Sequence, residues 1–239
     1  CGTVLASLTG LASVPIILTL AAVMGFGTFH TLRRLPQSLM RFLLRVVFAQ
    51  HYRLTVSGLQ HIPSRGGVLL LGNHTSWIDW AVLHLAVPRP VRFVMTRRYY
   101  DRWYLRWFLD LYRVIPITSS AASKSALRAI TDTLKAGECV VLFPEGAISR
   151  NGQLGPFRRG YAIPATQADC PIVPFYLRGL WGSRWSAVSR HFRRNTDGAL
   201  TRDVNLCFGP ALPPSASPME VKDAVHRMSI LAWQEFADS

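Results

Sequence analysis

The chain has 239 residues, of which 49% are hydrophobic and 17% charged, and its formal net charge is +14. This basic balance indicates an anionic partner, either nucleic acid or an acidic membrane surface, and the high apolar content favours the membrane. Neither a disulfide framework nor a zinc site is indicated, because the four cysteines lie far apart in the sequence, at Cys1, Cys139, Cys170 and Cys207.

The first 32 residues contain no Asp, Glu, Lys or Arg. Within them, residues 4–29 form an apolar run longer than the ~20 residues that span a bilayer. Arg33 and Arg34 follow directly, which favours the cytoplasmic side for the rest of the chain. A re-entrant hairpin broken near Pro15 or Gly25, or a buried core helix, are the alternatives. We therefore expect residues 1–50 to anchor the protein in the inner or cell membrane.

A second helix is expected to begin near Pro36, a residue suited to a first helical turn. Its apolar positions recur at helical spacing and form one face, which consists of Leu39, Phe42, Leu43, Val46 and Val47. Such a helix either lies among lipid headgroups or packs on the globular domain.

From residue 51 on, short apolar runs alternate with helical patterns, and we expect residues 51–239 to form one globular domain. Strands are predicted over residues 53–57, 68–71, 91–95, 114–117, 139–143, 172–177 and 204–208. Helices are predicted over residues 77–86, 99–109, 121–135, 158–168 and 218–236. This alternation predicts an α/β domain with a mixed, largely parallel sheet flanked by helices.

Residues 97–107, RRYYDRWYLRW, interleave arginines with aromatic residues. Rings and guanidinium groups together suit the headgroup zone of a membrane. They also suit nucleic acid, through stacking and phosphate contacts. The third interpretation is an amphipathic helix whose aromatic residues belong to the core.

The stretch from residue 68 to residue 80, VLLLGNHTSWIDW, carries a candidate catalytic pair. Its apolar opening predicts a buried strand, and a helix is expected to begin near Trp77, capped by one of the two preceding hydroxyl residues. His74 lies in the turn and Asp79 one turn into the helix, so the carboxylate can reach the imidazole. A histidine oriented by a carboxylate is the pair that takes a proton from an alcohol. The alternative is a helix-capping loop with a hydrogen-bonded histidine.

A second stretch, VVLFPEGAISRNG at residues 140–152, places a turn after another buried strand. Pro144 ends the strand, and Gly146 lets the backbone come close to a ligand. Glu145 between them is either a ligand-binding carboxylate or a turn residue.

Together these motifs resemble the glycerolipid acyltransferases, whose best-known members acylate 1-acylglycerol-3-phosphate. Asn73-His74-x-x-x-x-Asp79 resembles the first signature of the family, and Phe143-Pro144-Glu145-Gly146 resembles the one that binds the acceptor. The resemblance covers residues 52–212 and includes the blocks at 156–160 and 172–175. Residues 176–184 resemble more narrowly the acyltransferase portion of bifunctional lysophospholipid acyltransferase/acyl-carrier-protein synthetases. Because residue 1 is Cys and not Met, we expect a segment of such a fusion.

The chain departs from the family pattern at two phosphate-binding arginines. Ala147 and Ile148 stand where the family has Thr-Arg, and Thr118 stands where the second signature ends in arginine. Arg150 is the nearest replacement, two positions later than usual. The departure favours an acceptor whose phosphate already carries a head group over simple lysophosphatidic acid.

The resemblance implies a membrane-bound O-acyltransferase that moves a fatty acyl group from acyl-CoA or acyl carrier protein to the free hydroxyl of a lysophospholipid. It implies His74 as the base and Asp79 as its orienting carboxylate. The residues implied in substrate binding are Asn73, Ser76, Glu145, Gly146, Arg150 and Arg158. No metal or other cofactor is expected, and direct transfer is expected because no Gly-x-Ser-x-Gly elbow is present. Membrane lipids are expected partners and nucleic acid is not. The alternative function is a non-catalytic lipid-binding segment of a larger membrane protein.

Overall fold

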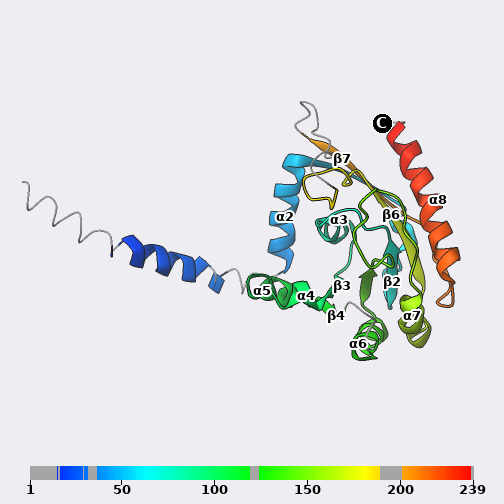
Figure 1. Cartoon of the computed structure of the whole chain (residues 1–239), viewed down its shortest axis with the longest axis horizontal. Coiled ribbons are helices and arrows are strands. Elements are labelled where there is room, and N and C mark those ends of the chain that lie inside the picture. The colour runs from blue at the N-terminus through cyan, green and yellow to red at the C-terminus, as the bar shows by residue number, and fades with distance from the viewer. Residues whose placement is uncertain are drawn as a thin grey trace, which may run out of the picture. The chain divides into compact units, whose positions relative to one another are not determined.

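The computed structural model describes residues 15, 17–28, 30–31, 37–118, 124–188 and 201–237 (Figure 1). The chain divides into two compact units, Cys1–Met40 and Arg41–Ser239. Residues 17–28 of the smaller unit are helical. Within the described part of the chain, no helix combines the length and apolarity needed to cross a membrane. Residues 4–14 of the expected span lie outside that part.

Helix α2 (Gln37–His51) begins where the sequence predicted a second helix. The division between the two units falls inside α2, ten residues before the boundary expected after residue 50. Phe48 is buried and its ring stacks on Tyr52 at 4.3 Å between centroids. The predicted apolar face is exposed instead, with Phe42 at 59% and Val47 at 60%. The helix contacts the larger unit through other residues, since the Arg41 guanidinium also donates to the carbonyls of Leu85 at 3.2 Å and Val87 at 2.7 Å.

The larger unit is built on one seven-stranded sheet in the order β1-β7-β6-β2-β5-β3-β4. Only the β6–β7 pair is antiparallel among the neighbouring pairs of this sheet. The mixed, largely parallel sheet and all seven predicted strands are thus confirmed. The strands are β1 (Tyr52–Ser57), β2 (Val68–Gly72), β3 (Val91–Thr96), β4 (Ile115–Ile117), β5 (Cys139–Leu142), β6 (Ile172–Arg178) and β7 (Arg202–Phe208).

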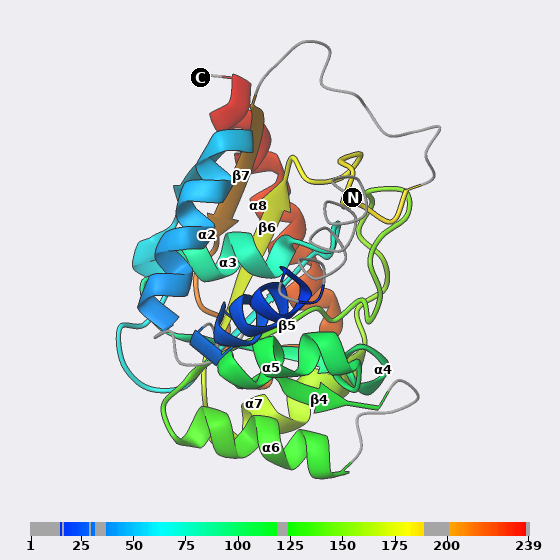
Figure 2. The ribbon, with the colours of Figure 1, turned by 90° about the vertical axis from the view of Figure 1, so that its left-hand side faces the viewer.

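Helices cover both faces of the sheet (Figures 1 and 2). α2 and α3 lie on one side, and α7 and α8 lie on the other. The helices after α2 are α3 (Asp79–Ala86), α4 (Arg97–Tyr100), α5 (Trp103–Leu111), α6 (Lys124–Lys135), α7 (Ala162–Ala168) and α8 (Pro218–Ala237). Two short 3₁₀ turns, η1 (Leu59–His61) and η2 (Arg159–Tyr161), complete the described elements.

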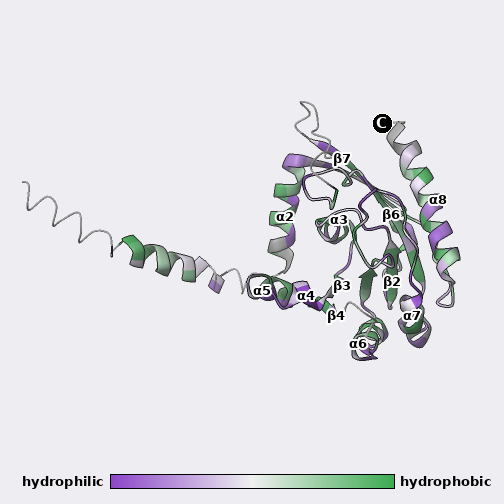
Figure 3. Cartoon of the chain, in the orientation of Figure 1, coloured by the Kyte–Doolittle hydropathy of each residue, from purple (hydrophilic) through white to green (hydrophobic). Residues whose placement is uncertain are grey.

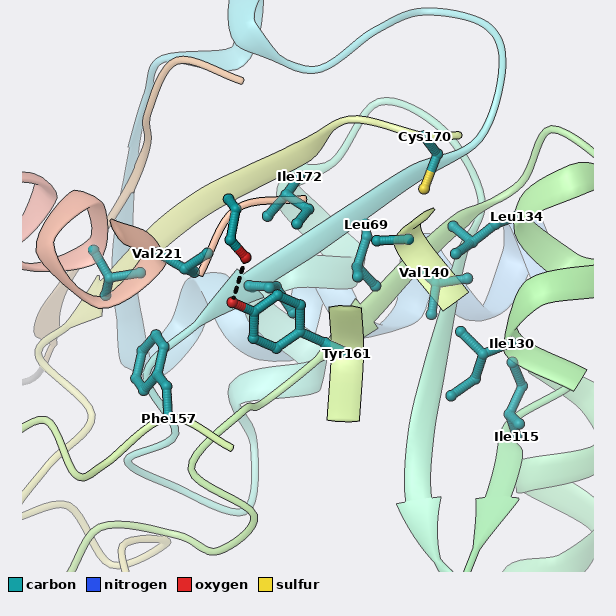
Figure 4. Packing of buried hydrophobic residues seen from close by; sticks show 14 residues of the cluster. Leu69, Ile115, Ile130, Leu134, Val140, Phe157, Tyr161, Cys170, Ile172 and Val221 are labelled. Atoms are coloured by element: carbon teal, nitrogen blue, oxygen red, sulfur yellow. Dashed lines mark hydrogen bonds between the residues drawn. The ribbon is translucent and has the colours of Figure 1, made fainter. Parts of the chain in front are cut away.

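Strand β2 is buried on both sides, which explains its unbroken apolar sequence. Successive side chains of a strand point to opposite faces. Leu69 and Leu71 enter the main core cluster, where they meet residues of α6, α7 and α8 (Figure 4). In this view the Tyr161 hydroxyl donates to the carbonyl of Ala216 at 3.0 Å. The centre of the sheet is therefore a rigid base for the turns that follow its strands.

Three predicted helices differ from those observed. The helix expected from Trp77 begins at Asp79. The helix expected over 99–109 is two, α4 and α5, because Arg102 between them is extended with φ −71° and ψ 117°. The helix expected from Arg158 begins as the 3₁₀ turn η2 at Arg159 and continues as α7 from Ala162. Arg158 itself is extended, and its N–H donates to the Pro144 carbonyl at 2.9 Å.

Candidate active site

The two predicted motifs meet at the carboxyl ends of β2 and β5, which are parallel neighbours at the centre of the sheet. Residues that follow parallel strands emerge at one edge, which is where α/β sheets commonly bind ligands. β2 ends at Gly72, directly before Asn73 and His74. A side chain at Gly72 would collide with the Phe175 ring of β6, because its Cβ would lie only 2.4 Å away. Close packing thus fixes the start of the His74 turn.

His74 and Asp79 form the hydrogen-bonded pair that the sequence predicted. Nδ1 of His74 lies 2.7 Å from Oδ2 of Asp79. The carboxylate is fully buried, whereas the imidazole is 22% exposed. Asp79 is the first residue of α3, where the positive end of the helix dipole favours a negative side chain. The pair therefore has one buried member and one accessible member.

The turn itself fixes the orientation of the Asp79 carboxylate. Oδ2 accepts hydrogen bonds from the N–H groups of Thr75 at 2.7 Å and Ser76 at 3.0 Å. Oδ1 accepts a hydrogen bond from the Ser76 hydroxyl at 2.6 Å. Thr75 and Ser76 were expected to cap α3, but here Asp79 bonds back to them. These hydrogen bonds hold the carboxylate in one orientation, with Oδ2 facing Nδ1 of His74.

The imidazole of His74 lies flat on the ring of Phe143, with centroids 4.0 Å apart and 11° between the planes. Its Nδ1 edge is taken by Asp79. Among the described residues, none has a hydrogen bond to Nε2. The exposed Nε2 edge is therefore the one that a substrate proton can reach.

Glu145 joins three segments of the site through its carboxylate. Oε1 accepts the His74 N–H at 3.0 Å, and Oε2 accepts the Gly155 N–H at 3.0 Å. Burial raises the pKa of Glu145, while the hydrogen bonds from Gly155 and His74 act in the opposite direction. A further bond, from Ser149 N–H to the His74 carbonyl at 2.7 Å, ties the same loops together. Of the two predicted roles for Glu145, this geometry supports the one that steadies the loop.

Asn73 and Ser76 were predicted to bind substrate, but their side chains are 2% and 0% exposed. The Asn73 amide donates to the Leu177 carbonyl at 2.8 Å and accepts the Leu177 N–H at 2.7 Å. The Ser76 hydroxyl is engaged with Asp79. Because their polar groups are bonded to the protein, both residues act in this structure by positioning the His74 turn.

Arg158 is the predicted cation that the structure brings to the site. Gly146 has φ +75°, and a Cβ there would lie 3.1 Å from the Arg158 guanidinium carbon. The guanidinium thus rests on the Glu145-Gly146 turn while the Arg158 side chain remains exposed. Arg150 is exposed too, but it contacts Trp181 through its backbone, whose carbonyl accepts the indole N–H at 3.3 Å. The site therefore gathers His74, Asp79, Glu145, Gly146 and Arg158.

Sequence reasoning missed the segment after β6 that supports the turn from its other side. The carbonyl of Trp185 accepts the Trp77 N–H at 2.9 Å, and Ser186 forms an antiparallel bridge with Ser76. These are backbone contacts between residues more than one hundred positions apart. The sequence carries no signal for them beyond the family-like stretch that precedes them.

A histidine paired with a buried carboxylate at the carboxyl edge of an α/β sheet has the geometry that general-base chemistry requires. The family model described as Acyltransferase matches residues 53–178, more than half of the chain. The chain belongs to this family, and within it to the glycerolipid acyltransferases that the motifs indicated.

Several proteins named 1-acyl-sn-glycerol-3-phosphate acyltransferase are similar to the chain. The Pseudomonas aeruginosa protein is 31% identical over 136 residues, which is 56% of this chain and 51% of that protein. The chloroplastic BAT2 protein of Brassica napus is 28% identical over 131 residues, 54% of this chain and 38% of that protein. The Chlamydomonas reinhardtii protein is 25% identical over 223 residues, 91% of this chain and 64% of that protein. The chain thus spans less than two thirds of each of these three relatives.

The fold is also similar to a crystal structure, that of the 1-acyl-sn-glycerophosphate (LPA) acyltransferase PlsC from Thermotoga maritima. The TM-score is 0.61, with 87% of this chain and 88% of that chain covered. At 18% sequence identity this likeness concerns the fold alone.

Proposed function

We propose that the chain transfers a fatty acyl group from a thioester, on coenzyme A or acyl carrier protein, to the free hydroxyl of a lysophospholipid. The observation that carries the proposal is the His74–Asp79 pair, with Nδ1 held at 2.7 Å by a buried carboxylate and Nε2 left accessible. Family membership and the names of the relatives support it.

In the proposed reaction, Nε2 of His74 removes the proton from the acceptor hydroxyl while the oxygen attacks the thioester carbonyl. The new C–O bond forms, and the C–S bond of the resulting tetrahedral intermediate then breaks. The leaving thiolate takes the proton back from the imidazolium and departs as a thiol. Asp79 holds the tautomer with the proton on Nδ1 and stabilises the positive charge of the imidazolium.

Arg158 is the cation that we assign to a substrate phosphate. Its guanidinium is exposed and lies against Gly146, directly after the Glu145 carboxylate that bonds to the His74 backbone. Guanidinium groups bind phosphate oxygens in a bidentate geometry. Arg150 is assigned a secondary role, because it is its backbone carbonyl that accepts the hydrogen bond from the Trp181 indole N–H.

Two acceptors are proposed. The names of the relatives favour 1-acylglycerol-3-phosphate. The residues Thr118 and Ile148, which stand at positions where the family pattern has arginine, favour a lysophospholipid whose phosphate already carries a head group. Fewer cations at the site suit a phosphodiester, which carries one negative charge less than a phosphomonoester at full ionisation.

We further propose that the protein works at a membrane, with the catalytic unit on the cytoplasmic side. Its acceptor is a membrane lipid, the net charge of +14 suits an anionic surface, and the exposed apolar face of α2 suits the headgroup region.

The experiment is an acyl-transfer assay with labelled acyl-CoA and acyl carrier protein against a panel of lysolipids with and without head groups. We expect His74→Ala to lower transfer by about 10²- to 10⁴-fold, the range of general-base catalysis. His226→Ala, at an exposed histidine on α8, is the matched control and should keep wild-type transfer. Transfer at the wild-type rate by His74→Ala would show that His74 is not the base. If the wild-type protein binds lysolipid but neither it nor any variant transfers an acyl group, the non-catalytic lipid-binding alternative is favoured.

A further inference from the structure

We infer that residues 97–107, which form α4 and the first half of α5, are a docking surface for an anionic phospholipid bilayer beside the active site. We call these residues the arginine–aromatic surface. The inference names the part of the molecule that meets the membrane, and it rests on the proposed function only for the reason why such contact is useful.

Two of the five aromatic side chains of this surface are exposed to solvent, and Tyr99, Tyr100 and Trp107 are half-buried. Trp103 is 86% exposed and Tyr104 is 47% exposed. The residue of α5 that enters the core is Leu109, beyond the surface itself. An indole exposed to this degree contributes little apolar burial to the folded state. Indole and phenol rings are enriched where proteins meet lipid headgroups.

The arginines of the surface are exposed as well, and they outnumber the acidic residues. Residues 97–107 contain four arginines and one aspartate. The side chains of Arg97 and Arg106 are 68% and 65% exposed, in loose pairs with Asp101 at 3.5 Å and Asp110 at 4.0 Å. Pairs this exposed are weak and leave the guanidinium groups available to phosphate. In Figure 3, α4 is hydrophilic beside a more hydrophobic α5.

Arg102 shows how charge and rings are combined here. Its backbone is extended between α4 and α5, and its guanidinium lies 5.4 Å from the Tyr99 ring centroid and 5.9 Å from that of Tyr104. It also donates a hydrogen bond to the Tyr104 hydroxyl at 2.6 Å. The interruption that the sequence did not predict thus keeps an arginine beside two phenol rings.

The surface is joined to the active site. The ring of Tyr99 contacts the ring of Trp77 edge to face, at 5.1 Å between centroids. Trp77 is 47% exposed and lies in the turn between His74 and Asp79. A bilayer that contacts the arginine–aromatic surface would therefore lie next to the turn that carries the base.

Helix α2 lies on the same side of the larger unit as α4 and α5, as Figures 1 and 2 both show. Phe42, Val46 and Val47 of α2 are exposed. An exposed apolar helix face and an arginine-rich aromatic surface on one side match the two layers of a membrane surface, acyl chains and anionic headgroups. This match of charge and apolarity is why we assign the surface to a bilayer and not to a second copy of the chain, which would bring like charges together.

The test places an environment-sensitive fluorophore at position 103 of the full chain, through Trp103→Cys in a Cys1→Ser background. Cys139, Cys170 and Cys207 are buried and protected from labelling. Vesicles of phosphatidylcholine mixed with phosphatidylglycerol should shift the emission to the blue, and a quencher carried on the lipid chains should reduce it. The control label is placed by Met219→Cys, a 68% exposed position on α8, on the other side of the sheet, and should keep its aqueous emission.

The charge dependence is tested with the same label at position 103. Arg98→Gln should weaken the vesicle affinity reported by that label about fivefold, the effect of one arginine near an anionic surface. Arg227→Gln, at an exposed arginine on α8, should leave it unchanged. Pure phosphatidylcholine vesicles should bind less tightly and should not distinguish these variants.

Three results would overturn the inference. The label at position 103 could keep its aqueous emission while the protein floats with the vesicles. Both labels could shift equally. The shift could occur without lipid and grow with protein concentration, which would assign the surface to a second copy of the chain. None of these readouts needs acyl transfer, so a failure of the proposed function leaves the vesicle result interpretable.

Discussion

The His74 turn and the arginine–aromatic surface lie side by side but use polar side chains in opposite ways. In the turn, Asp79 is fully buried and accepts hydrogen bonds from His74, Thr75 and Ser76. On the surface, Trp103 is 86% exposed and Arg97 is paired only loosely. The turn buries its polar groups in hydrogen bonds with the protein, whereas the surface keeps its charged side chains exposed to solvent.

This difference separates residues that position the catalytic pair from residues that we expect to contact the membrane. A buried polar group that loses its partner destabilises the protein, since its lost hydrogen bond to water is not replaced. An exposed group can be changed with little effect on folding. Substitutions in the turn should therefore alter stability and catalysis together, and substitutions on the surface should alter membrane contact alone.

Asp79→Asn should give the largest effect, a fall in kcat of about 10³-fold. An amide N–H₂ in place of Oδ2 would oppose the N–H groups of Thr75 and Ser76 and would turn an N–H toward Nδ1 of His74, which fixes the wrong tautomer. With the amide oxygen in that place instead, the negative charge that stabilises the imidazolium would still be lost. Steady-state transfer with saturating donor and acceptor measures it. Asp132→Asn, at an exposed aspartate on α6, is the control. A kcat within tenfold of wild type would show that His74 does not need its carboxylate.

Asn73→Ala should lower the free energy of unfolding by about 2–4 kcal/mol, because it leaves both the N–H and the carbonyl of Leu177 without their partner. Urea unfolding followed by circular dichroism measures the change. Asn151→Ala removes the same group from an exposed loop and should have a much smaller effect. Equal losses in the two variants would contradict the positioning role of Asn73.

Glu145→Gln should lower kcat about tenfold, since a lost hydrogen bond of ~1–1.5 kcal/mol has that effect when it is felt at the base. One carboxylate oxygen would become an amide N–H₂, which cannot accept a hydrogen bond. The N–H that faces it, that of His74 or that of Gly155, would therefore lose its acceptor. The KM for the acceptor should change little if Glu145 acts on the turn. A rise in KM with kcat unchanged would instead assign Glu145 to acceptor binding.

Glu138→Gln tests a partly buried ion pair outside the site. Glu138 bonds twice to the nearly buried Arg92, at 2.5 and 2.7 Å, and these bonds lower the pKa of Glu138. A carboxyl whose pKa is lowered by folding adds stability above its ordinary pKa, and this stability is lost as the pH falls toward the lowered value. The variant should therefore be less stable than wild type by about 1–2 kcal/mol at pH 7.

The difference between Glu138→Gln and wild type should narrow as the pH falls below the ordinary pKa of a glutamate, with kcat unchanged at pH 7. Urea unfolding at several pH values gives the comparison. A difference that stays constant across the acid range would mean that the charge of Glu138 is not what stabilises the pair.

Trp103→Ala should give the smallest effect on the folded protein, a change in unfolding free energy within about 0.5 kcal/mol. Its transfer to a water-dissolved, short-chain lysolipid should match wild type, since the residue is exposed and outside the site. Transfer to lysolipid embedded in vesicles should fall. A large loss of stability would show that Trp103 is a packing residue after all.

The sequence predicted the sheet and the His74–Asp79 pair that follows its central strand. The apolar run of β2 is continuous because the strand is buried on both faces, and the change from that run to Gly72, Asn73 and His74 marks the end of the strand. His74 and Asp79 were found because local chain geometry alone can bring them together. Glu145 was found because its turn follows the neighbouring strand.

The rest depended on contacts that no local pattern encodes. The family resemblance implied Asn73 and Ser76 in substrate binding, yet the Asn73 side chain bonds to Leu177, which is 104 residues away. The start of α3 shifted to Asp79 because the carboxylate of Asp79 bonds back to the turn. The break between α4 and α5 comes from one extended residue, Arg102, in a sequence that favours a continuous helix.

The flat stacking of His74 on Phe143 bears on the handedness of the acceptor. Nε2 accepts a proton in the plane of its own ring, so the hydroxyl must arrive in the imidazole plane. The Phe143 ring lies parallel to that plane to within 11°, with the two centroids 4.0 Å apart. The glycerol carbon that bears this hydroxyl, or its neighbour, is a stereocentre in a lysophospholipid. With one side of that plane closed by Phe143, the two enantiomers would place different substituents toward the open side. For the proposed reaction, an aromatic ring that forms no bond with the lipid would then decide which mirror image is acylated.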